Sequence, residues 1–180
     1  MKIAFTGHRP DKLYGYDKRN SENQNLIKFL TEKIEKIIKD EIALNGKDTR
    51  IEFISGMALG VDMWLADAVI KLRRKYSNVT LQCAIPCLNQ SSRWNMGDKM
   101  AWEKLVEKAD KVHYVSEKPY SNSCMQIRNV YMVDEADKIF AVWDGTSGGT
   151  KNCIEYAKKK KKPILVTNPK TKEEYELNVA

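Results

Sequence analysis

The chain has 180 residues, 42% hydrophobic and 31% charged, which suits one compact globular domain with a substantial core. No apolar run approaches the roughly 18 residues of a membrane span, and Lys2 to Phe5 opens the chain without a secretory leader pattern, so we expect a cytoplasmic protein without membrane contact. Lysine and arginine outnumber aspartate and glutamate by 31 to 24, and the resulting net charge of +7 favours anionic ligands.

Short apolar runs alternate with helical patterns from the start of the chain. Lys2 to Phe5 predicts a first strand, and apolar residues from Leu26 to Ile42 recur at the spacing of one helix face. Asn45-Gly46 is suited to close that helix. A second strand follows at Ile51 to Ile54, and Val61 to Leu72 again shows helical spacing. The first half of this pattern is therefore strand, loop, helix, repeated.

The alternation continues to the last strand. The further expected elements are a strand at 79–85 ended by Pro86, a helix at 98–109, a strand at 112–115, a helix at 124–136, a strand at 139–143, a helix at 150–160 and a last strand at 164–167. Strands that alternate with helices imply right-handed parallel crossovers and helices on both faces of the sheet. We therefore predict an α/β fold, a single doubly wound Rossmann-like domain over residues 1–180 with a mostly parallel sheet.

Glycine-containing loops follow several of these strands. Thr6 to Pro10, Ser55 to Asp62 and Asp144 to Thr150 all lie at strand carboxyl ends, where doubly wound sheets bind ligands. Glycine lets the backbone approach an anion, and the amides that start the next helix point toward it. The same glycines could serve chain reversal alone. We expect the loops to converge on one phosphate-binding crevice.

Several known site types do not fit. The chain contains neither G-x-G-x-x-G nor G-x-x-x-x-G-K-[ST], which disfavours a standard NAD enzyme or P-loop NTPase. Gly145 to Gly149 spells a G-x-S-x-G nucleophile elbow, but His8 and His113 both precede Ser147, so a hydrolase triad cannot be completed. The cysteines read as reduced thiols without a metal-binding pattern, and no metal or cofactor is expected.

Four segments together resemble the SLOG superfamily, and within it the YpsA-like family of bacterial and phage proteins: Thr6-Gly7-His8-Arg9-Pro10, Ser55-Gly56-Met57-Ala58-Leu59-Gly60-Val61-Asp62, Arg128-Asn129 and Gly148-Gly149-Thr150. Gln90, Trp94, Tyr120 and Met132-Val133-Asp134 extend the likeness along the chain. The resemblance implies a Rossmann-like fold that binds nucleotides, nucleotide-derived signals or nucleic acid. Relatives include DNA-processing protein A and the lonely-guy phosphoribohydrolases, whose functions differ, so fold alone cannot choose among them.

The phosphoribohydrolase pattern P-G-G-x-G-T-x-x-E is incomplete here. Its threonine aligns with Thr150, which places Cys153 where those enzymes carry a glutamate. The remaining candidates for a catalytic carboxylate are Asp62, Asp144 and Glu155. Asp62 could instead complement a helix dipole, Asp144 could cap a turn and Glu155 could face solvent.

Other side chains also have two readings. His8 and Arg9 could contact a phosphate or base, and Arg128 could bind the ligand or pair with Asp134 or another acid. Trp94, like Tyr120, could stack on a base or simply pack. The lysines at 158–162 suit a solvated helix end, with a nucleic-acid patch as the alternative.

We expect the chain to bind a nucleotide or nucleotide-derived ligand, such as an ADP-ribose-type signal, and to sense or sequester it. The alternatives are an N-glycosidic-bond hydrolase such as a phosphoribohydrolase, and a protein that binds single-stranded nucleic acid; a homo-oligomer is also compatible with the fold. The expected ligand-binding residues are Thr6, Gly7, His8, Arg9, Ser55, Gly56, Met57, Gly60, Asp62, Trp94, Arg128, Asn129, Asp144, Gly145, Gly148, Gly149 and Thr150.

Overall fold

The computed structural model describes residues 1–177, which form a seven-stranded sheet with the order β4-β3-β2-β1-β5-β6-β7. Neighbouring strands are parallel except for β6 and β7, which pair antiparallel. The strands are β1 (Lys2–Gly7), β2 (Ile51–Ser55), β3 (Val79–Ile85), β4 (Lys111–Tyr114), β5 (Lys138–Val142), β6 (Ile164–Thr167) and β7 (Glu174–Leu177). The predicted α/β class with a mostly parallel sheet is confirmed.

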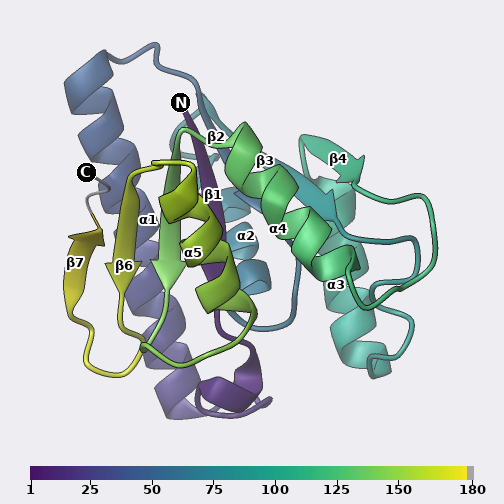
Figure 1. Ribbon diagram of the computed structural model, residues 1–180. Coiled ribbons are helices and arrows are strands. Elements are labelled where there is room, and N and C mark those ends of the chain that lie inside the picture. The colour runs from purple at the N-terminus through teal and green to yellow at the C-terminus, as the bar shows by residue number, and fades with distance from the viewer. Residues whose placement is uncertain (178–180) are drawn as a thin grey trace.

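Helices cover both faces of this sheet. In Figure 1, α4 and α5 lie in front of the strands and α1 and α2 lie behind them. The helices are α1 (Ser21–Asn45), α2 (Val61–Leu72), α3 (Met96–Lys108), α4 (Cys124–Glu135) and α5 (Gly149–Lys159), with a short 3-10 helix η1 (Pro10–Lys12). No helix within residues 1–177 has the length and apolar character needed to cross a bilayer.

Two element boundaries differ from expectation for identifiable reasons. α1 begins before its first buried leucine, because the Asn20 side chain accepts a 2.7 Å hydrogen bond from the amide of Asn23 and caps the helix. Ile164–Thr167 is not the last strand, since β7 follows it. β7 is a mostly exposed edge strand with two glutamates, and its only apolar residues are Tyr175 and Leu177.

The two faces of the sheet carry side chains of different size. Phe5, Phe53 and Phe140 point toward α1, α2 and α3, and the Phe5 and Phe53 rings stack with centroids 5.2 Å apart. On the opposite face, β1, β3 and β5 present Ala4, Ala84 and Ala141 to α4 and α5. The alternation along each strand therefore places the phenylalanines on one side and these alanines on the other, where Ile54, Ile139, Ile164 and Val166 fill the remaining strand positions.

The direction in which strands are added reverses at the centre of the sheet. From β1 the chain first builds outward through β2, β3 and β4, and then returns to place β5 on the other side of β1. The loops after β1 and β5 consequently leave the sheet in opposite directions. Such a switch point opens a crevice outside the carboxyl ends of the strands, which is where ligands bind in this architecture.

Candidate functional site

A cavity of about 160 Å³ lies at this switch point. The loops after β1, β2 and β5 meet there with the start of α4 and α5, so the three loops converge as expected. The lining residues are Thr6, Gly7, His8, Arg9, Asp11, Lys12, Ala58, Asp62, Met125, Arg128, Asn129, Gly148, Gly149 and Thr150. We call this cavity the crevice. Most of the expected ligand-binding residues line the crevice. The expected residues that do not line it are Ser55, Gly56, Met57, Gly60, Trp94, Asp144 and Gly145.

The amino end of α5 faces the crevice without a side-chain cap. Gly148 is the N-cap residue, with a φ of 141°, and its lack of a side chain leaves the first amides of the helix open. Gly149 and Thr150 form the first turn and line the crevice, and the Asn129 side chain donates to the Gly149 carbonyl at 3.4 Å. Uncapped amides and the positive end of the helix dipole favour an anion at this point.

Arg128 reaches the crevice from α4 and is almost completely buried. Its Nη1 lies 3.4 Å from Oδ2 of Asp62, and each side chain is only 7% exposed. The Ala58 amide also donates to Oδ2 of Asp62, whereas Nε of Arg128 has no hydrogen-bond partner among residues 1–177. Burial raises the pKa of Asp62 and outweighs the opposing effect of Arg128. Arg128 therefore pairs with Asp62 and not with Asp134. The hydrogen-bonding capacity of this buried pair is only partly used, because the pair is 3.4 Å apart and Nε of Arg128 has no partner among residues 1–177.

Gly56 allows Arg128 to occupy this position. A Cβ on Gly56 would lie 1.5 Å from Nη1 of Arg128, so the guanidinium rests directly on the backbone of the loop after β2. The side chain of Gln90 donates to the Gly56 carbonyl at 3.0 Å and holds the loop from beneath. Gly56 thus shapes the crevice without lining it.

Ser55, Met57 and Gly60 of the same loop also support the crevice without lining it. Ser55 Oγ donates to the Asp62 carbonyl at 2.9 Å and accepts from the Met57 amide, and Met57 is fully buried with a left-handed φ of 56°. Gly60 has a φ of 92°, and a Cβ there would lie 2.7 Å from the His8 carbonyl oxygen. Ser55 and Met57 thus fix the shape of the loop after β2, and Gly60 lets that loop approach the loop after β1 closely.

His8 and Asp144 join the loops that follow β1 and β5. His8 Nε2 lies 2.6 Å from Oδ1 of Asp144, and the imidazole is only 3% exposed. Burial is the largest influence on the pKa of His8 and lowers it, and together with Lys12 and Lys170 it outweighs the opposing effect of Asp144. Burial alone would raise the pKa of Asp144, but hydrogen bonds from Thr146 and His8 lower it overall. The neutral imidazole and the ionised carboxylate form one hydrogen-bonded unit.

This pairing predicts a pH dependence of stability. A histidine whose pKa is lower in the folded chain than the usual 6.5 takes up its proton more readily when unfolded, so the free energy of unfolding falls as the pH drops below about 6.5. His8→Gln should flatten this part of the stability profile. Denaturant unfolding between pH 5 and 8 checks the slope. NMR titration of the His8 ring with a midpoint at or above 6.5 would contradict the prediction.

Lys12 was not expected at the site, but it bridges the two loops. Its ammonium donates to the carbonyl of Ser147 and lies 3.3 Å from Oγ1 of Thr146. Lys12 becomes close only because η1 turns the chain back after Pro10. In the sequence, its sole signal is a position shortly after the Thr6 to Pro10 motif. Asp11, Ala58 and Met125 complete the unexpected part of the lining.

The remaining candidates fall outside the crevice. Trp94 is partly buried and packs against the larger core, and Tyr120 is 52% exposed. Glu155 is partly exposed and pairs with Lys158, which agrees with the expectation that it could face solvent. Cys153 is buried, and burial raises the pKa of its thiol to about 11, so it supplies no charge where the phosphoribohydrolases carry glutamate. Lys158 and Lys159 occupy the last turn of α5.

Comparisons with known proteins agree with this architecture. DNA processing protein A from Helicobacter pylori, whose structure is titled for its single-stranded DNA binding mode, superposes with a TM-score of 0.58 at 18% identity, covering 95% of this chain and 70% of that one. The SPbeta prophage-derived protein YoqJ of Bacillus subtilis is 34% identical over 149 residues, 77% of this chain and 85% of YoqJ.

More distant relatives and a family model complete the comparison. A UPF0398 protein of Halalkalibacterium halodurans is 28% identical over 160 residues, 88% of this chain and 80% of its own length. The model of the YspA SLOG family matches residues 3–170, which include every loop of the crevice. The resemblance expected from the loop motifs is thereby confirmed, and the chain belongs to the YspA SLOG family.

Proposed function

We propose that the crevice binds the phosphate of a nucleotide or nucleotide-derived ligand. The observation that carries the proposal is the uncapped amino end of α5 opposite the cationic side chains of Arg9, Lys12 and Arg128, all lining one cavity. Backbone amides at a helix start combined with arginine and lysine are a general solution for binding phosphate.

The size of the crevice limits which part of the ligand it encloses. Cavities that enclose whole drug-sized ligands measure roughly 300–1,000 Å³, whereas the crevice measures about 160 Å³. A phosphate with part of its ribose fits this volume, and the base would extend past Arg9, which is exposed at the rim. Recognition in this arrangement depends mainly on phosphate and sugar.

The arrangement supports sensing or sequestration more than hydrolysis. Cys153 replaces the glutamate of the phosphoribohydrolase pattern and is buried. Asp144 is engaged by His8 and Thr146, and Asp62 is paired with Arg128. Neither carboxylate is left to activate a water molecule in this geometry.

Single-stranded nucleic acid is the second candidate ligand. The structural neighbour from Helicobacter pylori is described as binding single-stranded DNA. The net charge of +7 and the cations of the crevice would suit a phosphodiester backbone as well as a free phosphate. The two ligands differ in salt dependence, because a strand that contacts several cations releases several counterions when it binds.

A thermal-shift titration tests the proposal. We expect AMP, ADP or ADP-ribose to raise the melting temperature, because a ligand that binds only the folded chain stabilises it by about 2.7 kcal/mol at 100 times its Kd. Gly149→Asp should abolish the shift: its Cβ would meet nothing within 4 Å, and its carboxylate would compete for the α5 amides while complementing the helix dipole. Lys12→Ala should weaken binding about tenfold.

The matched control is Lys47→Ala, which removes the same charge from an exposed loop before β2, at the amino ends of the strands and away from the crevice. It should bind as the original chain does. If no nucleotide shifts the melting temperature, but oligothymidine binds and weakens steeply with salt, the nucleic-acid function replaces the nucleotide function. If neither binds, or if Gly149→Asp binds normally, the crevice is not the site. Turnover of a bound nucleoside monophosphate would establish an enzyme.

A further inference from the structure

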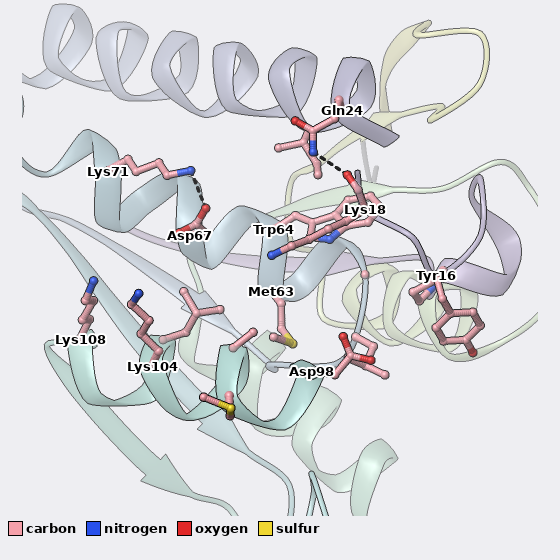
Figure 2. A pocket seen from close by; sticks show the side chains of 17 residues that line it. Tyr16, Lys18, Gln24, Met63, Trp64, Asp67, Lys71, Asp98, Lys104 and Lys108 are labelled. Atoms are coloured by element: carbon pink, nitrogen blue, oxygen red, sulfur yellow. Dashed lines mark hydrogen bonds and ion pairs between the residues drawn. The ribbon is translucent and has the colours of Figure 1, made fainter. Parts of the chain in front are cut away.

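A second and larger cavity, of about 700 Å³, lies over α2 between α1 and α3. Figure 2 shows the three helices side by side, with Trp64, Asp67 and Lys71 on the middle one and Lys104 and Lys108 facing them from α3. The contact of Pro10 with Gly60 lies at its edge toward the crevice. We call this cavity the helix groove.

The floor of the helix groove is apolar and follows helical spacing. On α3, Ala101 and Leu105 lie four residues apart on one helix face, and Met63 and Trp64 supply the facing part of α2. Met63 and Leu105 are buried, whereas Met100 on the wall is 60% exposed. Methionine side chains adapt to irregular apolar partners, which suits a surface that receives a peptide.

Charged groups stand at the rim and are unevenly distributed. Lys71, Lys104 and Lys108 gather at one end, and Asp98 and Lys18 lie toward the other (Figure 2). Lys71 pairs with Asp67 at 2.7 Å, but Lys104 and Lys108 are exposed and make no ion pair with any residue from 1 to 177. The lysine end is therefore open to carboxylates.

We propose that the helix groove docks an amphipathic, acidic helix of a partner protein. The partner's apolar face would lie on the floor, with its carboxylates at the lysine end. α2 has 12 residues and so extends over about 18 Å, which matches three to four turns of a partner helix. An apolar floor with a polar rim is the usual anatomy of a protein interface, and helices commonly dock in such grooves.

The same observations disfavour other occupants. A small-molecule site relies on a few fixed polar groups, whereas the charged side chains here are long and exposed or only half-buried, including Lys18 and Lys71. Nucleic acid would meet the carboxylates of Asp67 and Asp98 within the groove. Charge complementarity at the lysine end thus selects an acidic helix.

Selection from a display library of 16-residue helical peptides tests this proposal, with affinities measured by anisotropy of the labelled synthetic peptides. Enriched peptides should share an apolar i, i+3, i+4, i+7 stripe and acidic residues toward one end. Ala101→Arg, which fills the floor, should weaken them about 100-fold, and the double change Lys104→Glu and Lys108→Glu about tenfold or more. Lys99→Glu makes one such charge reversal on α3 outside the groove and should alter affinity less than about twofold.

Circular dichroism and melting temperature establish that each variant folds. The proposal is overturned if no such peptide is enriched, or if the enriched peptides bind Ala101→Arg normally. It is also overturned if sedimentation shows a dimer that Ala101→Arg converts to monomer, which would assign the groove to a second copy. Binding of oligothymidine that Lys104→Glu and Lys108→Glu abolish would likewise replace the acidic helix with nucleic acid.

Discussion

Arg128→Ala is expected to lower the free energy of unfolding by about 3–5 kcal/mol, because it leaves a buried carboxylate without its cation. Asp62 is 7% exposed in its side chain, and its pKa is already raised by burial despite Arg128. Without the guanidinium, Asp62 must either remain charged in an apolar setting or take up a proton. Urea denaturation at pH 7 measures the loss, which should shrink as the pH is lowered and Asp62 is neutralised.

Arg73→Ala provides a matched control for the Arg128 substitution. Arg73 contacts Asp110 at 2.8 Å, closer than the 3.4 Å between Arg128 and Asp62, but these side chains are 28% and 39% exposed. If burial of the ion pair determines how much stability is lost, Arg73→Ala should lower the free energy of unfolding by about 1 kcal/mol or less. Replacing the buried pair by apolar residues, Arg128→Met with Asp62→Leu, should recover most of the stability. Equal losses at Arg128 and Arg73 would contradict this account.

Gly56→Ala should destabilise the chain by about 3 kcal/mol and impair ligand binding, although it adds only one methyl group. The methyl carbon would lie 1.5 Å from Nη1 and 2.3 Å from Cζ of Arg128, so the guanidinium must leave its place between the loop and Asp62. The same substitution at Gly97 in α3 finds its nearest neighbour at 3.4 Å and should be neutral or slightly stabilising, because alanine favours a helix more than glycine does.

A double-mutant cycle separates this cause from general strain in the loop. In the Arg128→Ala background, Gly56→Ala has no guanidinium to displace and should cost less than about 1 kcal/mol. Chemical denaturation of the four proteins gives the coupling free energy. Additive losses would mean that Gly56 is needed by the backbone or by Gln90 and not by Arg128.

The fold was predictable because its signals are local. The apolar runs at 79–85 and 164–167 match β3 and β6 residue for residue, and Gly46 closes α1 with a positive φ, as Asn45-Gly46 predicts. β7 was missed because Glu-Tyr-Glu-Leu is mostly exposed and contains two glutamates, so it has no apolar run of the kind that Val112 to Val115 shows near the other edge. Its place depends on pairing with β6, which is a tertiary contact.

The candidate site was predictable only in part, for the same reason. Residues with special backbone needs, such as Gly148 and Gly149, are visible as motifs, and parallel topology brings their loops together. Whether a motif residue lines the crevice or supports it depends on packing, as the positions of Gly56 and Met57 show. Lys12 reaches the crevice because the short 3-10 helix η1 turns the chain, and no sequence pattern predicts that turn.

The three alanines between the sheet and the helices α4 and α5 have a consequence for how this family can diversify. Ala4, Ala84 and Ala141 lie under the helix pair whose residues Arg128 and Gly149 reach the crevice. A larger side chain at any of these positions would act as a spacer and lift the helix from the strands, since packed interiors do not absorb an added methylene without shifting. Under the proposed function, ligand preference is therefore expected to change with substitutions at positions that never touch the ligand, because they alter the depth at which Arg128 lies.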